Sequence, residues 1–148
     1  MFTAYDAVTA DNLPADADYA FYYMDGAFRN ESAVRARCPH AILFSITVLG
    51  DLRADIADCE PGCMSPFQTV GWVGAKVRRG HKRPRIYADL ATWGDQTFTD
   101  RIAKAAPSAR RALALWDDDP AVPEGYAAKQ FRSTSALDTW TLLQEFLD

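Results

Sequence analysis

The sequence contains few of the residues that build structural metal sites, with three cysteines and two histidines among its 148 residues. The cysteines Cys38, Cys59 and Cys63 include no C-x-x-C pair, and neither His40 nor His81 lies at a ligand spacing from them. We therefore expect no structural zinc site. Reduced thiols are the expected state, and a disulfide between Cys59 and Cys63 remains an alternative.

Long apolar runs and an excess of positive charge are also missing. No stretch approaches the roughly 20 apolar residues of a membrane span, and no charged n-region followed by an apolar h-region opens the chain. The net charge is -4, and the densest basic run, 78–83, falls where a helix should end and complements its dipole. We expect no membrane partner, no export signal and no nucleic-acid partner.

Cofactor motifs are absent as well. Three consecutive acids, Asp117 to Asp119, stand before Pro120, but a calcium loop needs ligands at alternate positions, a glycine and a distal glutamate. The sequence therefore predicts no metal ion and no other cofactor.

The composition and the pattern of apolar residues predict one folded domain over residues 1–148. Apolar residues make up 49% and charged residues 24%, which is typical of a globular protein with a real core. Strand and helix patterns alternate, which favours an α/β protein with a largely parallel sheet. Strands are predicted over 2–5, 19–24, 41–48, 55–60, 84–88, 111–116 and 125–131, and helices over 30–37, 66–79, 95–106 and 135–147.

Two acids at the end of the fourth predicted strand have the most informative spacing. Side chains alternate between the faces of a strand, so Asp58 and Glu60 share a face and Cys59 points the other way. Their Cα atoms would lie roughly 7 Å apart, close enough for each charge to make the other harder to ionise. Such a pair suits acid/base chemistry on glycosides. The alternative is two solvated acids at a strand end.

Further acids stand where other predicted strands end, among them Asp6, Asp25 and Asp138. In α/β barrels this edge is the catalytic face. A full eight-fold barrel typically takes about 250 residues, so we predict a reduced TIM-type barrel of about seven or eight mostly parallel strands that lacks several outer helices. Read locally, Asp25 is a turn residue that also has the position of a site residue, and Asp138 is the cap of the last helix.

The order of these features resembles the family 25 glycoside hydrolases, which are muramidases that cut peptidoglycan, and it resembles compact phage-encoded glycoside-hydrolase-like proteins more closely. The similarity spans nearly the whole chain. It is carried by Tyr5-Asp6, Asp58-x-Glu60, Glu60-Pro61-Gly62 through Gly71-Trp72-Val73, Ile86-Tyr87 followed by Trp93, Leu115-Trp116, Lys129-Gln130-Phe131 and Leu137-Asp138.

The resemblance implies roles for four acids. Glu60 matches the proton donor, and Asp58 matches the acid two residues before it, which stabilises an oxocarbenium-like transition state or orients the substrate's acetamido group. Asp6 and Asp138 match the acids that flank the substrate. Sugar-stacking surface is expected from three aromatic residues, for which a core position is the alternative: Tyr23, Tyr87 and Trp116.

The chain also departs from the family pattern. It is short, Ala7-Val8 follow Asp6 where a small polar residue is common, and Cys59 replaces an aliphatic residue. The sequence therefore leaves two alternative functions. The first is a muramidase acting on cell-wall glycan. The second is a weakly active or inactive virion component, in a phage tail or capsid, that keeps the barrel for glycan binding or as a scaffold among other virion proteins. Both place the protein in the host cytoplasm or in the virion.

Overall fold

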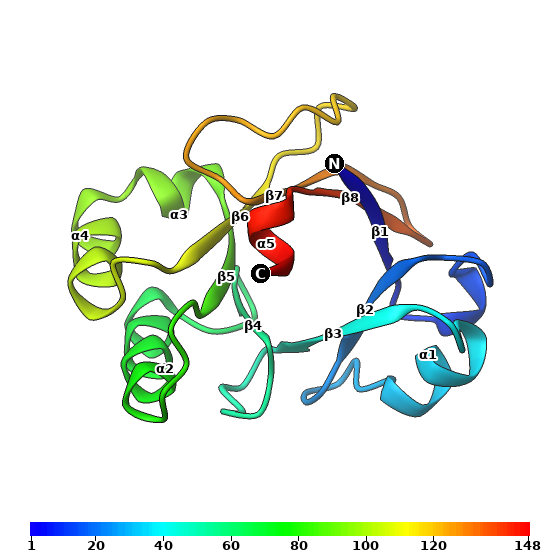
Figure 1. Cartoon of the computed structure of the whole chain (residues 1–148), viewed down its shortest axis with the longest axis horizontal. Helices are drawn as coiled ribbons and strands as arrows, with labels where there is room; N and C mark the ends of the chain where they lie inside the picture. The colour runs from blue at the N-terminus through cyan, green and yellow to red at the C-terminus, as the bar shows by residue number, and fades with distance from the viewer.

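A computed structural model describes all residues, 1–148, as a closed eight-stranded barrel with five α-helices and one 3-10 helix (Figure 1). The strands are β1 (Phe2–Asp6), β2 (Tyr19–Tyr23), β3 (Ile42–Thr47), β4 (Ile56–Cys59), β5 (Arg85–Asp89), β6 (Arg110–Ala114), β7 (Ala128–Ser133) and β8 (Asp138–Leu142). The helices are η1 (Ala10–Asn12), α1 (Glu31–Arg37), α2 (Pro66–Arg78), α3 (Leu90–Gly94), α4 (Gln96–Ala105) and α5 (Gln144–Leu147). No helix is long and apolar enough to cross a bilayer.

The strands follow their sequence order around the barrel. Each strand from β1 to β7 is parallel to the next, and β8 closes the barrel by pairing antiparallel with both β7 and β1. The predicted α/β barrel is therefore confirmed. An all-parallel TIM arrangement is not, because the last strand runs in reverse.

The predicted C-terminal helix is wrong. Ser135 lies in the tight turn of a β-hairpin, where Thr134 N donates to Leu137 O at 3.1 Å, and Asp138 begins β8 instead of capping a helix. The S-x-x-D pattern had suggested a helix start, but Thr139, Trp140 and Thr141 are β-branched or aromatic and favour a strand. Strand pairing on both sides outweighs that local helix signal. Only α5 remains helical here.

The barrel interior is a cluster of 13 buried residues closed at one end by α5. Phe146 of α5 packs against Phe21 and Phe44, with ring centroids 6.4 and 5.7 Å apart. The Arg85 side chain donates to the main-chain oxygens of Phe146 at 2.7 Å and Leu147 at 3.2 Å. These contacts fill the end of the barrel where the parallel strands begin, so the opposite end is left for a site.

Helices cover only part of the outer surface. In Figure 1, α2, α3 and α4 lie on one side of the barrel and α1 lies on another. The outer face of β7 is covered by the loop 115–127 instead of a helix. Lys129 is buried there and binds Asp117 Oδ1 at 2.8 Å and the carbonyl oxygen of Asp119 at 2.8 Å. These acids therefore hold a loop in place.

Helix α2 carries the segment after the paired acids. Ser65 caps it in a reciprocal capping box with Gln68, Pro66 occupies its first turn, and it ends at Arg78 with Gly80 at a φ of +89°. Both ends were predicted from these residues. The basic run lies at the helix C-terminus, as expected.

Candidate active site

A small cavity lies inside the barrel at the edge where the parallel strands end. Its volume is about 80 Å³, which holds a few water molecules and is far below the roughly 300 Å³ of a typical ligand pocket. Only part of a larger ligand fits inside, and the rest would contact the mouth. The cavity is lined by Asp6, Tyr23, Ile46, Asp58, Glu60, Tyr87, Trp116, Gln130, Ser133, Asp138 and Trp140.

Strand β4 presents the paired acids to the cavity. Ile56 belongs to the barrel interior, whereas Ala57 and Cys59 pack in the outer cluster beneath α2 and α4. Strand alternation therefore turns Asp58 inward, and Glu60, just after the strand, continues on the same side. Both acids line the cavity. The predicted shared face is thus observed, and Cys59 is a free, buried thiol with no bridge to Cys63.

Asp6 and Asp138 meet across the seam that closes the barrel. Asp6 ends β1 and Asp138 begins the antiparallel β8, so the two are directly opposed in register. The indole Nε1 of Trp140 donates to Asp6 Oδ2 at 2.6 Å. The reversal of β8 thus places an acid from the start of a strand beside acids from strand ends. All four predicted catalytic acids line one cavity.

Burial and proximity keep protons on the pair of Asp6 and Asp138. Burial, the charge of Asp138 and a hydrogen bond between the two carboxyl groups raise the pKa of Asp6 to about 8, although the bond from Trp140 opposes this. The pKa of Asp138 is also raised, chiefly by burial. Two carboxylates in contact cannot both ionise cheaply. We therefore infer that Asp6 carries the shared proton at neutral pH and donates it to Asp138.

The second pair has different pKa values. Burial raises the pKa of Asp58 to about 6, and a hydrogen bond with Cys63 opposes the shift. Burial and the charge of Asp58 raise the pKa of Glu60 to about 7. Burial and the neighbouring Asp58 in turn raise the pKa of the Cys63 thiol to about 12, so it is protonated. At a pH between the pKa of Asp58, about 6, and that of Glu60, about 7, Asp58 is mainly ionised while Glu60 is mainly protonated.

Gln130 connects the aromatic side of the cavity. Its Oε1 accepts from the Tyr87 hydroxyl and from Trp116 Nε1, the latter at 2.6 Å. Burial raises the pKa values of Tyr87 and Tyr23, so both phenols stay neutral. Trp116 is 61% exposed and stands at the mouth. Of the three predicted stacking residues, Trp116 therefore offers the free surface, and Tyr87 is nearly all buried.

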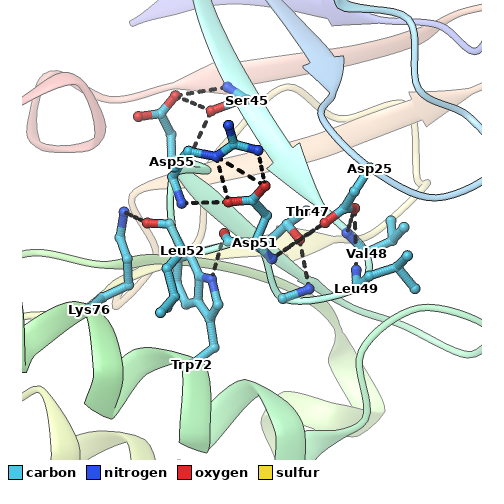
Figure 2. Close-up of polar contacts among 12 residues, drawn as sticks. Asp25, Ser45, Thr47, Val48, Leu49, Asp51, Leu52, Asp55, Trp72 and Lys76 are labelled. Atoms are coloured by element: carbon cyan, nitrogen blue, oxygen red, sulfur yellow. Dashed lines mark hydrogen bonds and ion pairs between the residues drawn. The ribbon is translucent and has the colours of Figure 1, made fainter.

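Asp25 does not line the cavity. Its carboxylate accepts from the Thr47 hydroxyl, from Val48 N at 2.8 Å and from Leu49 N at 3.3 Å (Figure 2). It therefore binds the loop that joins β3 to β4. The same loop is held from the other side by α2, where Trp72 Nε1 donates to the carbonyl oxygen of Asp51 at 3.0 Å. Of its two predicted roles, the turn role describes this geometry.

Four cavity residues were missed by sequence reasoning, the apolar Ile46 and three residues with polar groups, Gln130, Ser133 and Trp140. Gln130 was a polar residue in an apolar strand pattern, two positions after inward-facing Ala128, and that alternation was an available signal. Trp140 was assigned to a helix face. Ser133 follows a β-bulge between Gln130 and Arg132, which shifts the register of β7 against β8, and bulges near sites re-aim side chains in this way.

Two carboxylate oxygens in this site lack a partner. Asp58 Oδ1 and Asp138 Oδ1 are both buried without a hydrogen bond. A buried acceptor without a donor costs about 1–3 kcal/mol. Two such atoms beside one cavity are ready to accept N–H or O–H groups from a bound molecule, and a protonated Glu60 beside them is ready to donate.

Comparisons of the chain with protein-family models, with curated proteins and with solved structures found no match. Any function assigned to this chain therefore depends on the chemistry of its cavity.

Proposed function

We propose that this protein is a glycoside hydrolase of muramidase type, built on a reduced TIM-type barrel whose last strand is reversed, and that it cuts cell-wall glycan strands. The observation that supports this most is the presence of four carboxyl groups, from β1, β4 and β8, in one cavity at one barrel edge. Glycoside hydrolysis needs a protonated acid and an ionised acid on either side of the scissile bond.

Glu60 is the general acid in this proposal. Its raised pKa leaves it protonated near neutral pH, so it can protonate the oxygen of the leaving sugar as the glycosidic bond breaks. Asp58, ionised at the same pH, either stabilises the oxocarbenium-like transition state or accepts the N–H of a 2-acetamido group through its free Oδ1. Water then completes the hydrolysis, and Glu60 recovers its proton from that water.

The remaining groups position the sugar. Asp138 Oδ1 has no partner, so it can accept a hydroxyl of the sugar, while Asp6 holds Asp138 in place. Because the cavity is small, the ring of the sugar would rest at the mouth against Trp116 and only the groups near the scissile bond would enter.

Loss of turbidity and release of reducing ends from cell-wall suspensions test this function. We expect Glu60→Gln to slow both by about 10²- to 10⁴-fold, the usual contribution of a general acid. Glu124→Gln, a matched change at an exposed glutamate outside the cavity, should leave the rate unchanged. A folded native protein that releases no reducing ends at high concentration would refute the proposal.

A second function, a virion component without turnover, is favoured by exposed apolar side chains in the segments that follow the parallel strands. Each strand from β1 to β6 is followed, before the next strand begins, by at least one exposed large apolar side chain, among them Val8, Phe28, Leu49, Phe67, Leu90 and Trp116. Exposed apolar side chains gathered at one edge of a protein are typical of protein contacts. Detection of the protein in purified phage particles at a fixed, symmetric copy number, without wall cleavage, would support this alternative over the enzyme.

A further inference from the structure

Two surface hollows lie next to the candidate site, and together we call them the side groove. Its first part, a hollow of about 290 Å³, includes Glu60 and follows the loop between β4 and α2. Its second part, of about 310 Å³, lies between the first turns of α2 and α4. The two parts share Ser65 and Pro66, and the first shares Glu60 with the cavity. The side groove therefore adjoins the site at Glu60.

The lining of the second part does not suit a row of sugars. Ser65 and Asp95 use their oxygens to cap α2 and α4, with Asp95 Oδ1 accepting from Thr97 N at 2.8 Å. What remains is mainly apolar surface, including a Phe67 side chain that is 78% exposed, together with the exposed Arg101, the Thr97 hydroxyl and the second oxygen of Asp95. Arg101 makes no ion pair in the structure. Sugar hydroxyls need many polar partners, whereas this surface suits apolar groups and one anion.

We propose that the side groove binds a short peptide branch attached to the glycan, with small apolar side chains on Phe67 and a free carboxylate on Arg101. This inference rests on the proposed function. The groove starts at Glu60, which lies at the scissile bond, so a branch on the adjoining sugar leaves the glycan in this direction.

Charge supports the same occupant. Asp58 in the cavity is mainly ionised at neutral pH and the chain has a net charge of -4, so a carboxylate is repelled from the site itself. An unpaired guanidinium at the far end of the groove offers it a place away from that charge. Guanidinium and carboxylate also match in geometry, because two parallel N–H donors meet two oxygens.

The test compares two samples of the same wall glycan, one with its peptide branches and one stripped of them by an amidase. We expect the native protein to cut the branched glycan faster, and Arg101→Gln to lose roughly tenfold on that sample alone, the usual effect of one charged hydrogen bond. Lys104→Gln is the control, because it removes the same charge from an exposed position of the same helix outside the groove. It should keep the native preference.

Three results would overturn the inference. Equal cleavage of both samples by the native protein would refute the peptide branch while the hydrolase function stands. An equal loss of cleavage rate on both samples with Arg101→Gln would mean that the guanidinium does not bind the peptide branch. Absence of both cleavage and binding for either sample would refute the proposed function and the side groove with it.

Discussion

Replacing Asp6 by asparagine should stabilise the protein, by an amount that grows with pH. Asparagine has the shape of a protonated aspartic acid, so its oxygen can still accept from Trp140 Nε1 and its amide can donate to Asp138. What it removes is the titration of a buried acid. Unfolded, Asp6 releases its proton near its ordinary pKa of 3.8, whereas the folded protein holds it up to a pKa of about 8.

The direction in which stability changes with pH follows from the number of protons that the folded and unfolded states bind. Between these two pKa values the folded state binds the extra proton, so stability falls as pH rises from 3.8 to about 8 and is level above that. Each pH unit costs about 1.4 kcal/mol, so the ceiling at pH 7 is roughly 4 kcal/mol. Asp6→Asn should therefore match the native protein near pH 4 and exceed its free energy of unfolding by up to that amount at pH 7.

Urea denaturation at pH 4, 5.5, 7 and 8 measures this difference. Asp16→Asn, the same change at an exposed position outside the cavity, is the control for the substitution itself. A difference between Asp6→Asn and the native protein that does not vary with pH would refute the shared proton. So would a variant that is less stable at pH 7 than at pH 4 relative to the native protein.

Two further predictions follow from the pKa values and from the loop contacts. The cleavage rate should depend on pH as a bell-shaped curve with its maximum between about pH 6 and 7. Below that range Asp58 becomes protonated, and above it Glu60 loses its proton, so activity falls on both sides. A plateau that reaches pH 9 in a reducing-end assay would contradict these roles. Asp25→Ala should lower the free energy of unfolding by about 3 kcal/mol, because it strips the loop 47–51 of a charged acceptor. Urea midpoints of this variant and of Asp16→Ala check that value, and equal midpoints would count against it.

Local patterns predicted the elements that depend on local forces. The apolar run of β3, the capped α2 and the alternation that turns Asp58 and Glu60 to one face all follow from neighbouring residues. These features are reliable because the period of a strand or helix acts over a few residues. They gave seven of the eight strands and the central pair of acids.

The missed features depend on contacts between distant residues. Local signals conflict at 138–142, where the S-x-x-D pattern favours a helix and the β-branched and aromatic residues favour a strand. Pairing with β1, more than 130 positions away, decides the outcome. Likewise the carboxylate of Asp25 is drawn into a loop by Val48 N and the Thr47 hydroxyl, which become neighbours only after folding. Asp138 reached its predicted place by a route that the sequence did not reveal.

That route connects the fold to the chemistry. A parallel last strand would need a crossover of a dozen or more residues, whereas the hairpin between β7 and β8 closes the barrel with a short turn. The reversal also puts the first residue of β8, instead of its last, at the rim with Asp6. Four acids then share one small cavity, two of them with unpaired oxygens. Such an arrangement lowers the stability of the empty protein, and in the function that we propose this cost is offset when the substrate supplies hydrogen-bond donors to those oxygens.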